Sequence, residues 1–276
     1  MSATVDVSNG QTAQAFDGRL VTVLRPSDSH NLIVCFNGYS RMAHARPDLP
    51  FETALMGLNW LNVFDANILW VAEEKPTWYL QHEETVISRI IDIMLERDIR
   101  EIKFIGSSAG AYASIRAGLL LDKALVERGI SASIFAFAMN PQTGFRTELI
   151  ERAVTTSIRA GWNPRLLGVD PILLADVYRD AYQHKLPDIS DIVQVYKPKN
   201  FATILMYDSL NPIEQVFSGD ILSAEWLIAF PKPLGVPHGS GCTQFWTEYL
   251  WDTFDRVAPF GKLSAEPTDD DLRLVA

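Results

Sequence analysis

The sequence predicts an α/β protein with a doubly wound, mostly parallel sheet, helices on both faces and a helical insertion. Short apolar runs alternate with longer stretches of helical periodicity from about residue 19 to residue 256. Several of these runs are continuously apolar, which is typical of parallel strands buried on both faces. Of the 276 residues, 47% are hydrophobic and 21% are charged. This composition and length suit one large globular α/β domain or two small ones.

Seven segments have the composition of strands, because each is short, apolar and bounded by turn-forming residues. In chain order they are Arg19–Leu24, Asn31–Phe36, Asn67–Ala72, Glu101–Ile105, Ser133–Met139, Thr203–Tyr207 and Glu225–Phe230. Strands that alternate with helices are joined by right-handed crossovers. We therefore expect a parallel sheet whose strands have their carboxyl ends at a common edge, where ligands bind in such sheets.

Three helices are expected to cover the sheet. Glu83–Arg97 carries apolar residues at helical spacing and predicts an amphipathic helix. Ala109–Arg128 is the second helix, and Gly129 is well suited to end it as a left-handed cap residue. The third runs from about residue 243 to residue 256 and has aromatic and apolar residues that can pack inward.

The alternation of strands and helices breaks between about residues 145 and 200. Three helices are predicted there, at Thr147–Arg159, Pro171–His184 and Asp191–Tyr196. We interpret residues 145–200 as a helical insertion, or cap, over the carboxyl edge of the sheet. The alternative is a longer packing helix with decorated loops. Residues 1–144 and 201–262 would then form the core domain, and residues 263–276 a flexible tail.

Composition narrows the range of partners. The formal net charge of −10 argues against nucleic-acid and anionic membrane partners. There is no run of ~20 apolar residues, so no membrane span is expected. Cys35 and Cys242 lack metal-ligand spacing, and we expect neither a metal nor a cofactor. We expect a cytoplasmic protein with reduced cysteines, with a Cys35–Cys242 disulfide as the alternative.

The residues Gly106–Gly110 read GSSAG and fit the spacing G-x-S-x-G, with Ser108 at its centre. They fall between a predicted strand and a predicted helix, where a sharp turn requires small residues beside the serine. The N-terminus of a helix favours negative charge, so the N–H of Ala109 could stabilise an oxyanion after Ser108 attacks a carbonyl. The alternative is that Ser108 only caps the helix.

This strand–GSSAG–helix unit, with the order of strands and helices from about residue 19 to residue 256, resembles the α/β-hydrolase superfamily. The resemblance is at superfamily level and rests on a few short motifs. It implies a catalytic triad in the chain order serine, acid, histidine. It also implies that the acid and the histidine follow later strands of the sheet.

Under this resemblance His238 is the candidate base. It follows the last predicted strand in the segment GVPHGSG, whose glycines and proline predict an exposed loop. Asp208 is the candidate acid, because it directly follows the strand Thr203–Tyr207. Asp220 and Glu214 are the alternative acids.

The second oxyanion donor is expected from the loop after the strand Asn31–Phe36. The backbone N–H of Tyr39 is the candidate, with Gly38 allowing the turn, and it would act beside the N–H of Ala109. The residues expected to bind substrate are Ser40, Arg41, Trp78 and Tyr79. The alternative interpretation is a solvated charged stretch and aromatic side chains that belong to the core.

The sequence therefore predicts a serine hydrolase that cleaves a carboxylic ester or thioester of a small-molecule acyl substrate. The acyl-enzyme would form on Ser108. An acyltransferase with the same triad and a non-catalytic binding protein of the same fold are the alternatives. A dinucleotide-binding oxidoreductase is disfavoured, because no G-x-G-x-x-G follows the first predicted strands.

Overall fold

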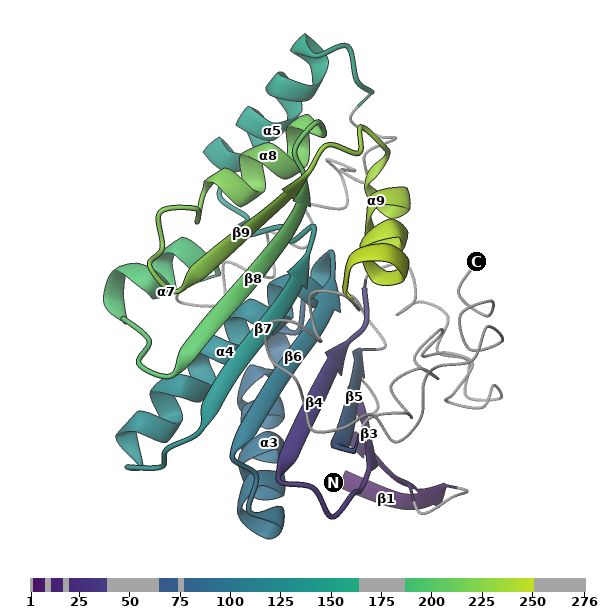
Figure 1. Ribbon diagram of the computed structural model, residues 1–276, viewed down its shortest axis with the longest axis vertical. Coiled ribbons are helices and arrows are strands. Elements are labelled where there is room, and N and C mark those ends of the chain that lie inside the picture. Colours follow the sequence, from purple (N-terminus) through teal and green to yellow (C-terminus); the bar gives the residue numbers. More distant parts are fainter. Residues whose placement is uncertain are drawn as a thin grey trace.

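The computed structural model describes residues 2–7, 11–16, 20–38, 65–73, 77–163 and 187–250 (Figure 1). Within them the strands form one nine-stranded sheet in the order β1-β2-β3-β5-β4-β6-β7-β8-β9. The strands are β1 (Ser2–Val7), β2 (Gln11–Phe16), β3 (Leu20–Arg25), β4 (Asn31–Phe36), β5 (Asn67–Glu73), β6 (Glu101–Ser107), β7 (Ser133–Met139), β8 (Phe201–Asp208) and β9 (Leu227–Lys232). The pairs from β5 through β4 to β9 are parallel, and the pairs from β1 through β3 to β5 are antiparallel. The predicted, mostly parallel sheet is confirmed.

The hairpin β1–β2 was not predicted from the sequence. The two strands pair with each other and, through β2, with β3 along the antiparallel end of the sheet. In β1, Ala3, Val5 and Val7 alternate with polar residues in the period-2 pattern of a strand, whereas in β2 this alternation is broken at Ala15 and Phe16.

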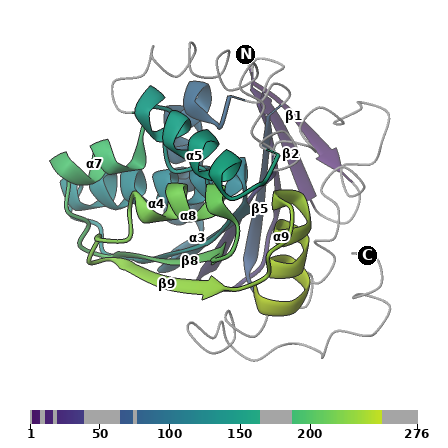
Figure 2. The same cartoon turned by 90° about the horizontal axis from the view of Figure 1, so that it is seen from above.

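Helices lie on both faces of the sheet, as predicted (Figure 2). They are α3 (Glu83–Arg97), α4 (Ala109–Glu127), α5 (Thr147–Arg159), α7 (Ile189–Val195), α8 (Pro212–Gly219) and α9 (His238–Gln244), with a 3-10 turn η3 (Leu80–His82) before α3 and a π-helical turn (Phe245–Tyr249) after α9. Helices α3, α4 and α7 pack on one face, and α9 with the π-helical turn packs on the other. No helix in the described part of the chain is long and apolar enough to cross a membrane.

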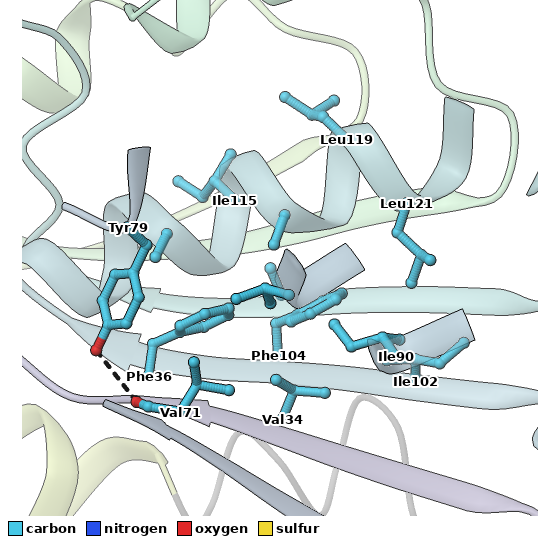
Figure 3. Packing of buried hydrophobic residues seen from close by; sticks show 14 of the residues in the cluster. Val34, Phe36, Val71, Tyr79, Ile90, Ile102, Phe104, Ile115, Leu119 and Leu121 are labelled. Carbon is cyan, nitrogen blue, oxygen red and sulfur yellow. Dashed lines mark hydrogen bonds between the residues drawn. The ribbon is translucent and has the colours of Figure 1, made fainter. Parts of the chain in front are cut away.

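The central strands separate two hydrophobic cores by their alternating side chains. On β4, Leu32, Val34 and Phe36 belong to the core beneath α3 and α4, which Figure 3 shows from close by. Ile33 and Cys35 belong to the core on the opposite face. The strand is therefore buried on both faces, which accounts for the continuous apolar run Asn31–Phe36. Burial of one such apolar side chain stabilises a fold by ~1.5–3 kcal/mol.

The carboxyl-terminal elements differ in detail from the prediction. Strand β9 lies at the edge of the sheet and spans Leu227–Lys232, and Ile228 on it is 53% exposed. Helix α9 begins at His238, five residues before the predicted start at about residue 243. The predicted end of that helix and the predicted tail lie beyond Leu250, outside the described residues.

Between β7 and β8 the structure contains α5 and α7, which match two of the three predicted helices. The predicted helix Pro171–His184 lies outside the described residues. Helix α5 packs against α8 through a small apolar cluster that includes Leu149 and Phe217. The division into a core domain, an insertion that acts as a cap and a flexible tail stays a prediction.

Candidate active site

Ser108 occupies a sharp turn between β6 and α4. Its backbone has φ 55° and ψ −120°, a conformation that a residue with a side chain rarely adopts. A Cβ at Gly106 would lie 2.2 Å from the carbonyl oxygen of Gly110, and a Cβ at Gly110 would lie 2.4 Å from that of Phe36. The turn therefore requires glycine at both positions. The Ser108 side chain makes no capping hydrogen bond to α4, so the capping alternative does not describe its contacts.

The structure brings His238 to Ser108, as the sequence predicted. The Nε2 atom of His238 lies 2.8 Å from Oγ of Ser108. The predicted exposed loop is wrong in one respect, because Pro237 precedes a helix and His238 is the first residue of α9. A proline with its fixed φ is suited to the start of a helix. The side chain of His238 is 20% exposed, which leaves it accessible from one side.

The acid that contacts His238 is Glu214, and the prediction of Asp208 is wrong in this respect. Oε1 of Glu214 lies 3.0 Å from Nδ1 of His238. The carboxylate of Asp208 instead accepts the backbone N–H groups of Leu210, Leu234 and Val236 at 2.9–3.0 Å. It thus holds the turn after β8 and the segment that leads to α9.

Asp220, the other alternative acid, lies elsewhere. Its carboxylate pairs with Arg146, which also pairs with the buried carboxylate of Asp188 at 2.7 Å. Arg146 directly precedes α5, Asp188 directly precedes α7 and Asp220 directly follows α8, so the two ion pairs link the ends of these three helices. Asp220 belongs to this ion-pair cluster and not to the site at His238.

Helix α8 places Glu214 opposite the histidine. Asn211 caps this helix, and its Oδ1 accepts the N–H groups of Ile213 and Glu214, while Pro212 occupies the first turn. Oε2 of Glu214 accepts the backbone N–H of Asp208 at 2.7 Å. A carboxylate held by a second donor presents its free oxygen to the histidine in a fixed direction.

Helix α9 approaches this carboxylate closely at Gly241. A Cβ there would lie 2.9 Å from Nδ2 of Asn140 and 3.7 Å from Oε1 of Glu214. Asn140 follows β7 and is buried, with φ 51°. A side chain at position 241 would therefore separate α9, and His238 with it, from the end of the sheet.

The pKa values of the pair are shifted by burial and by each other. Burial raises the pKa of Glu214, and the hydrogen bond and charge of His238 act in the opposite direction. Burial acts to lower the pKa of His238, but Cys242 and Glu214 outweigh it and raise that pKa well above its usual range. The imidazole therefore keeps its proton to higher pH than a free histidine does, and it can act as a general base only in its neutral form.

Cys242 is a member of this site that the sequence did not predict. Its Sγ lies 3.8 Å from Nε2 of His238 and 3.7 Å from Nδ2 of Asn140. Both Cys35 and Cys242 are free, which contradicts the alternative of a disulfide between them. The sequence signal is the spacing i, i+4 from His238 to Cys242 on one helix face, and it is visible only when the helix start is known.

The described part of the predicted oxyanion region lies beside the nucleophile turn. A Cβ at Gly38 would lie 3.2 Å from the carbonyl oxygen of Ser107, and Ala109 is the fully buried first residue of α4. The candidates Tyr39, Ser40 and Arg41 lie outside the described residues. Their roles stay predictions.

Trp78 and Tyr79 belong to the hydrophobic core. They are 4% and 3% exposed, and the Trp78 ring packs edge-on against Phe145 with 5.6 Å between centroids. The Tyr79 hydroxyl lies 3.0 Å from the carbonyl oxygen of Asn37 and 3.1 Å from that of Val71. These contacts favour the core interpretation over direct substrate binding.

Within the described ranges, no three His, Cys, Asp or Glu side chains gather in a way that could hold a metal ion. A hydroxyl, an imidazole and a buried carboxylate form one hydrogen-bonded line from Ser108 through His238 to Glu214.

No family model matches the chain, and no curated protein matches it. Solved structures do match. A candidate esterase from Staphylococcus aureus aligns with a TM-score of 0.54 at 10% identity, over 94% of this chain and 82% of its own. A brefeldin A esterase, described as a bacterial homologue of human hormone-sensitive lipase, aligns with a TM-score of 0.51 at 16% identity, over 99% and 77%.

A third neighbour belongs to a glycosylation-associated protein complex (Gap123) from Streptococcus agalactiae. It aligns with a TM-score of 0.54 at 12% identity over 95% of this chain, which spans about half (48%) of that chain. At such identities these similarities establish the fold alone. The protein has the α/β-hydrolase fold.

Proposed function

We propose that this protein is a serine hydrolase that cleaves a carboxylic ester or thioester through an acyl-enzyme on Ser108. The observation that carries the proposal is the line of contacts from Ser108 Oγ to His238 Nε2 at 2.8 Å and from His238 Nδ1 to Glu214 Oε1 at 3.0 Å. A nucleophile within hydrogen-bond reach of a base, which is itself oriented by an acid, is the arrangement that such catalysis requires.

In the first step the hydroxyl of Ser108 attacks the acyl carbon while Nε2 of His238 accepts its proton. Glu214 stabilises the resulting imidazolium through Nδ1 and holds the ring in place. The negative oxygen of the tetrahedral intermediate would accept hydrogen bonds from backbone N–H groups near the start of α4 and in the segment that follows β4. One such donor is typically worth a factor of ~100–1000 in rate.

In the second step the imidazolium protonates the departing alcohol or thiol. Water then takes the place of the leaving group and loses a proton to Nε2 as it attacks the acyl-enzyme. The imidazolium then returns this proton to Oγ of Ser108 as the bond between Oγ and the acyl carbon breaks, which releases the carboxylic acid product. An alcohol or amine in place of water would complete an acyl transfer through the same residues.

The strained backbone of Ser108 supports the same role. The turn holds φ at 55° and is kept by close contacts at Gly106 and Gly110. Such strain clusters at functional sites, where the surrounding structure over-determines it. A serine that served only as a helix cap would need none of it.

A panel of p-nitrophenyl esters with different acyl lengths, run beside acyl thioesters, tests the proposal. We expect turnover of at least one series by the native protein and its loss in Ser108→Ala by a factor of ~1000 or more. Ser107→Ala is the matched control and should retain most activity. Equal losses in the two variants, or equal turnover by Ser108→Ala and the native protein, would contradict the proposal.

A further inference from the structure

Tyr79 lies in a strained turn between β5 and α3. Its φ is 64°, and that of the preceding Trp78 is 52°. Two consecutive bulky residues with positive φ are rare, and such a conformation persists only where the surroundings enforce it. We therefore expect a specific contact of Tyr79 in the core to hold the turn in this conformation.

A buried carboxylate holds this turn through two hydrogen bonds. Glu73, the last residue of β5, is fully buried and accepts the N–H of Thr77 at 2.9 Å and its hydroxyl at 2.6 Å. These bonds fix the segment that carries Tyr79. The aromatic ring of Tyr79 then packs edge-on against Phe36 at the end of β4, with 4.9 Å between centroids.

The hydroxyl of Tyr79 joins the ends of two neighbouring strands. It lies within hydrogen-bond distance of the carbonyl oxygens of Val71 on β5 and of Asn37 just after β4; Figure 3 shows the bond to Val71. The N–H of Asn37 also donates to Val71, at 3.3 Å. Burial raises the pKa of Tyr79 well above its usual range, and the charge of Glu73 adds to this, so the hydroxyl keeps the proton that it donates.

The peptide unit held by this hydroxyl borders the nucleophile turn. In a planar trans peptide the C=O and the N–H point in opposite directions, so a bond to the carbonyl of Asn37 also sets the direction of the Gly38 N–H. A Cβ at Gly110 would lie 3.0 Å from the oxygen of Asn37, and one at Gly38 would lie 3.2 Å from that of Ser107. A rotation of this peptide would therefore disturb the close contacts at the start of α4.

We propose that Tyr79 is a positioning residue for the backbone N–H of Gly38, and that it acts through the peptide between Asn37 and Gly38. The inference rests on the proposed function, because it assumes that the Gly38 N–H helps to receive the oxyanion. Such a donor must lie within ~2.7–3.1 Å of an oxygen that carries full charge only in the transition state. The Tyr79 hydroxyl fixes the direction of this N–H before the substrate arrives, which lowers the barrier and leaves ground-state binding largely unchanged.

Tyr79→Phe tests the proposal because it removes the hydroxyl and keeps the ring against Phe36. Tyr112→Phe is the matched control, since Tyr112 is also buried and its hydroxyl also donates to a backbone carbonyl, that of Pro187. Both variants are assayed for kcat, KM and thermal midpoint. The ratio of the rates with an ester and with the matching thionoester is also measured, because sulfur fits an oxyanion site poorly only when its donors are in place.

We expect Tyr79→Phe to lower kcat by ~10- to 100-fold with little change in KM, and to lower the ester-to-thionoester ratio. Tyr112→Phe should lose thermal stability to a similar degree and keep the native ratio. If Tyr79→Phe does not fold, Thr77→Val, which loses the hydroxyl bond to Glu73, should lower the same ratio more weakly.

An unchanged ratio in Tyr79→Phe, or an equal fall in Tyr112→Phe, would overturn the assignment of Tyr79 while native turnover persists. If Ser108→Ala turns over substrate as fast as the native protein, the proposed function itself fails. The two failures are therefore distinguishable in one set of assays.

Discussion

Asp208 donates its backbone N–H to Oε2 of Glu214 at 2.7 Å, so the end of β8 holds the carboxylate that faces His238. The two acids thus have different contacts. Glu214 contacts the histidine, whereas the side chain of Asp208 binds the backbone of Leu210, Leu234 and Val236. Glu214 therefore contributes to the charge around His238, whereas the side chain of Asp208 contributes to the fold of the segments beside the site.

Glu214→Gln should lower kcat by ~1000-fold or more, because the amide cannot stabilise the imidazolium and can favour the wrong tautomer. Asp208→Asn should lower the thermal midpoint, because its amide group replaces an acceptor with a donor opposite backbone N–H groups. Its loss of kcat should be the smaller of the two. Steady-state kinetics and thermal melting on both variants check this, and the reverse order of kcat losses would contradict the assignment of Glu214.

The error at the acid has a physical origin in the sequence. A strand that ends in Asp208 places a carboxylate at the correct edge of the sheet, and the sequence pattern does not reveal that backbone N–H groups occupy it. Asn211, Pro212 and Glu214 have the spacing of a helix start, with a cap, a first-turn proline and an acid at the third position. Recognition of α8 from this signal would have favoured Glu214.

Other features were predictable to different degrees. The buried central strands follow from continuous apolar runs, and Ser108 follows from the small residues at a sharp turn. His238 was predicted from the triad order that the resemblance to the α/β-hydrolase superfamily implies. Asn9-Gly10 is a strong hairpin signal between β1 and β2, and it follows the alternating residues Ala3, Val5 and Val7, so this hairpin could have been predicted from the sequence. The contact of Cys242 with His238 could not be found, because it depends on a helix that begins within a segment rich in glycine and proline.

The pH dependence of activity should reflect the raised pKa of His238. Only the neutral imidazole accepts a proton, so kcat/KM should rise with pH through that raised pKa, above the ordinary histidine value of ~6.5. Cys242→Ala removes one group that raises the pKa, so the rise should move to lower pH. A pH profile of kcat/KM in both proteins checks this, and a profile that stays in place or moves to higher pH would contradict it.

The same shift affects stability with a defined sign. A raised pKa in the folded state means that folding favours the protonated histidine, which stabilises the fold fully below the unfolded pKa. This contribution is lost as the pH rises through the folded pKa. Urea titrations across that pH window should therefore show that the free energy of unfolding declines less with rising pH in His238→Gln than in the native protein.

Alkylation of Cys242 should abolish activity. Its thiol is partly exposed and lies 3.8 Å from Nε2 of His238, so the carbamidomethyl group that the sulfur gains when it displaces iodide from iodoacetamide would crowd the base. Cys35 is buried, and burial raises its pKa, so it should react slowly. Cys242→Ala should be active and resistant to inactivation by iodoacetamide. Inactivation of Cys242→Ala at the native rate would show that alkylation of Cys242 is not the cause.

A fluorophosphonate probe, with peptide mapping by mass spectrometry, determines whether Ser108 is the nucleophile of a serine hydrolase. We expect one adduct on Ser108, retained in Ser107→Ala and absent from Ser108→Ala. An adduct that persists in Ser108→Ala, or a native protein that forms none while folded, would contradict it.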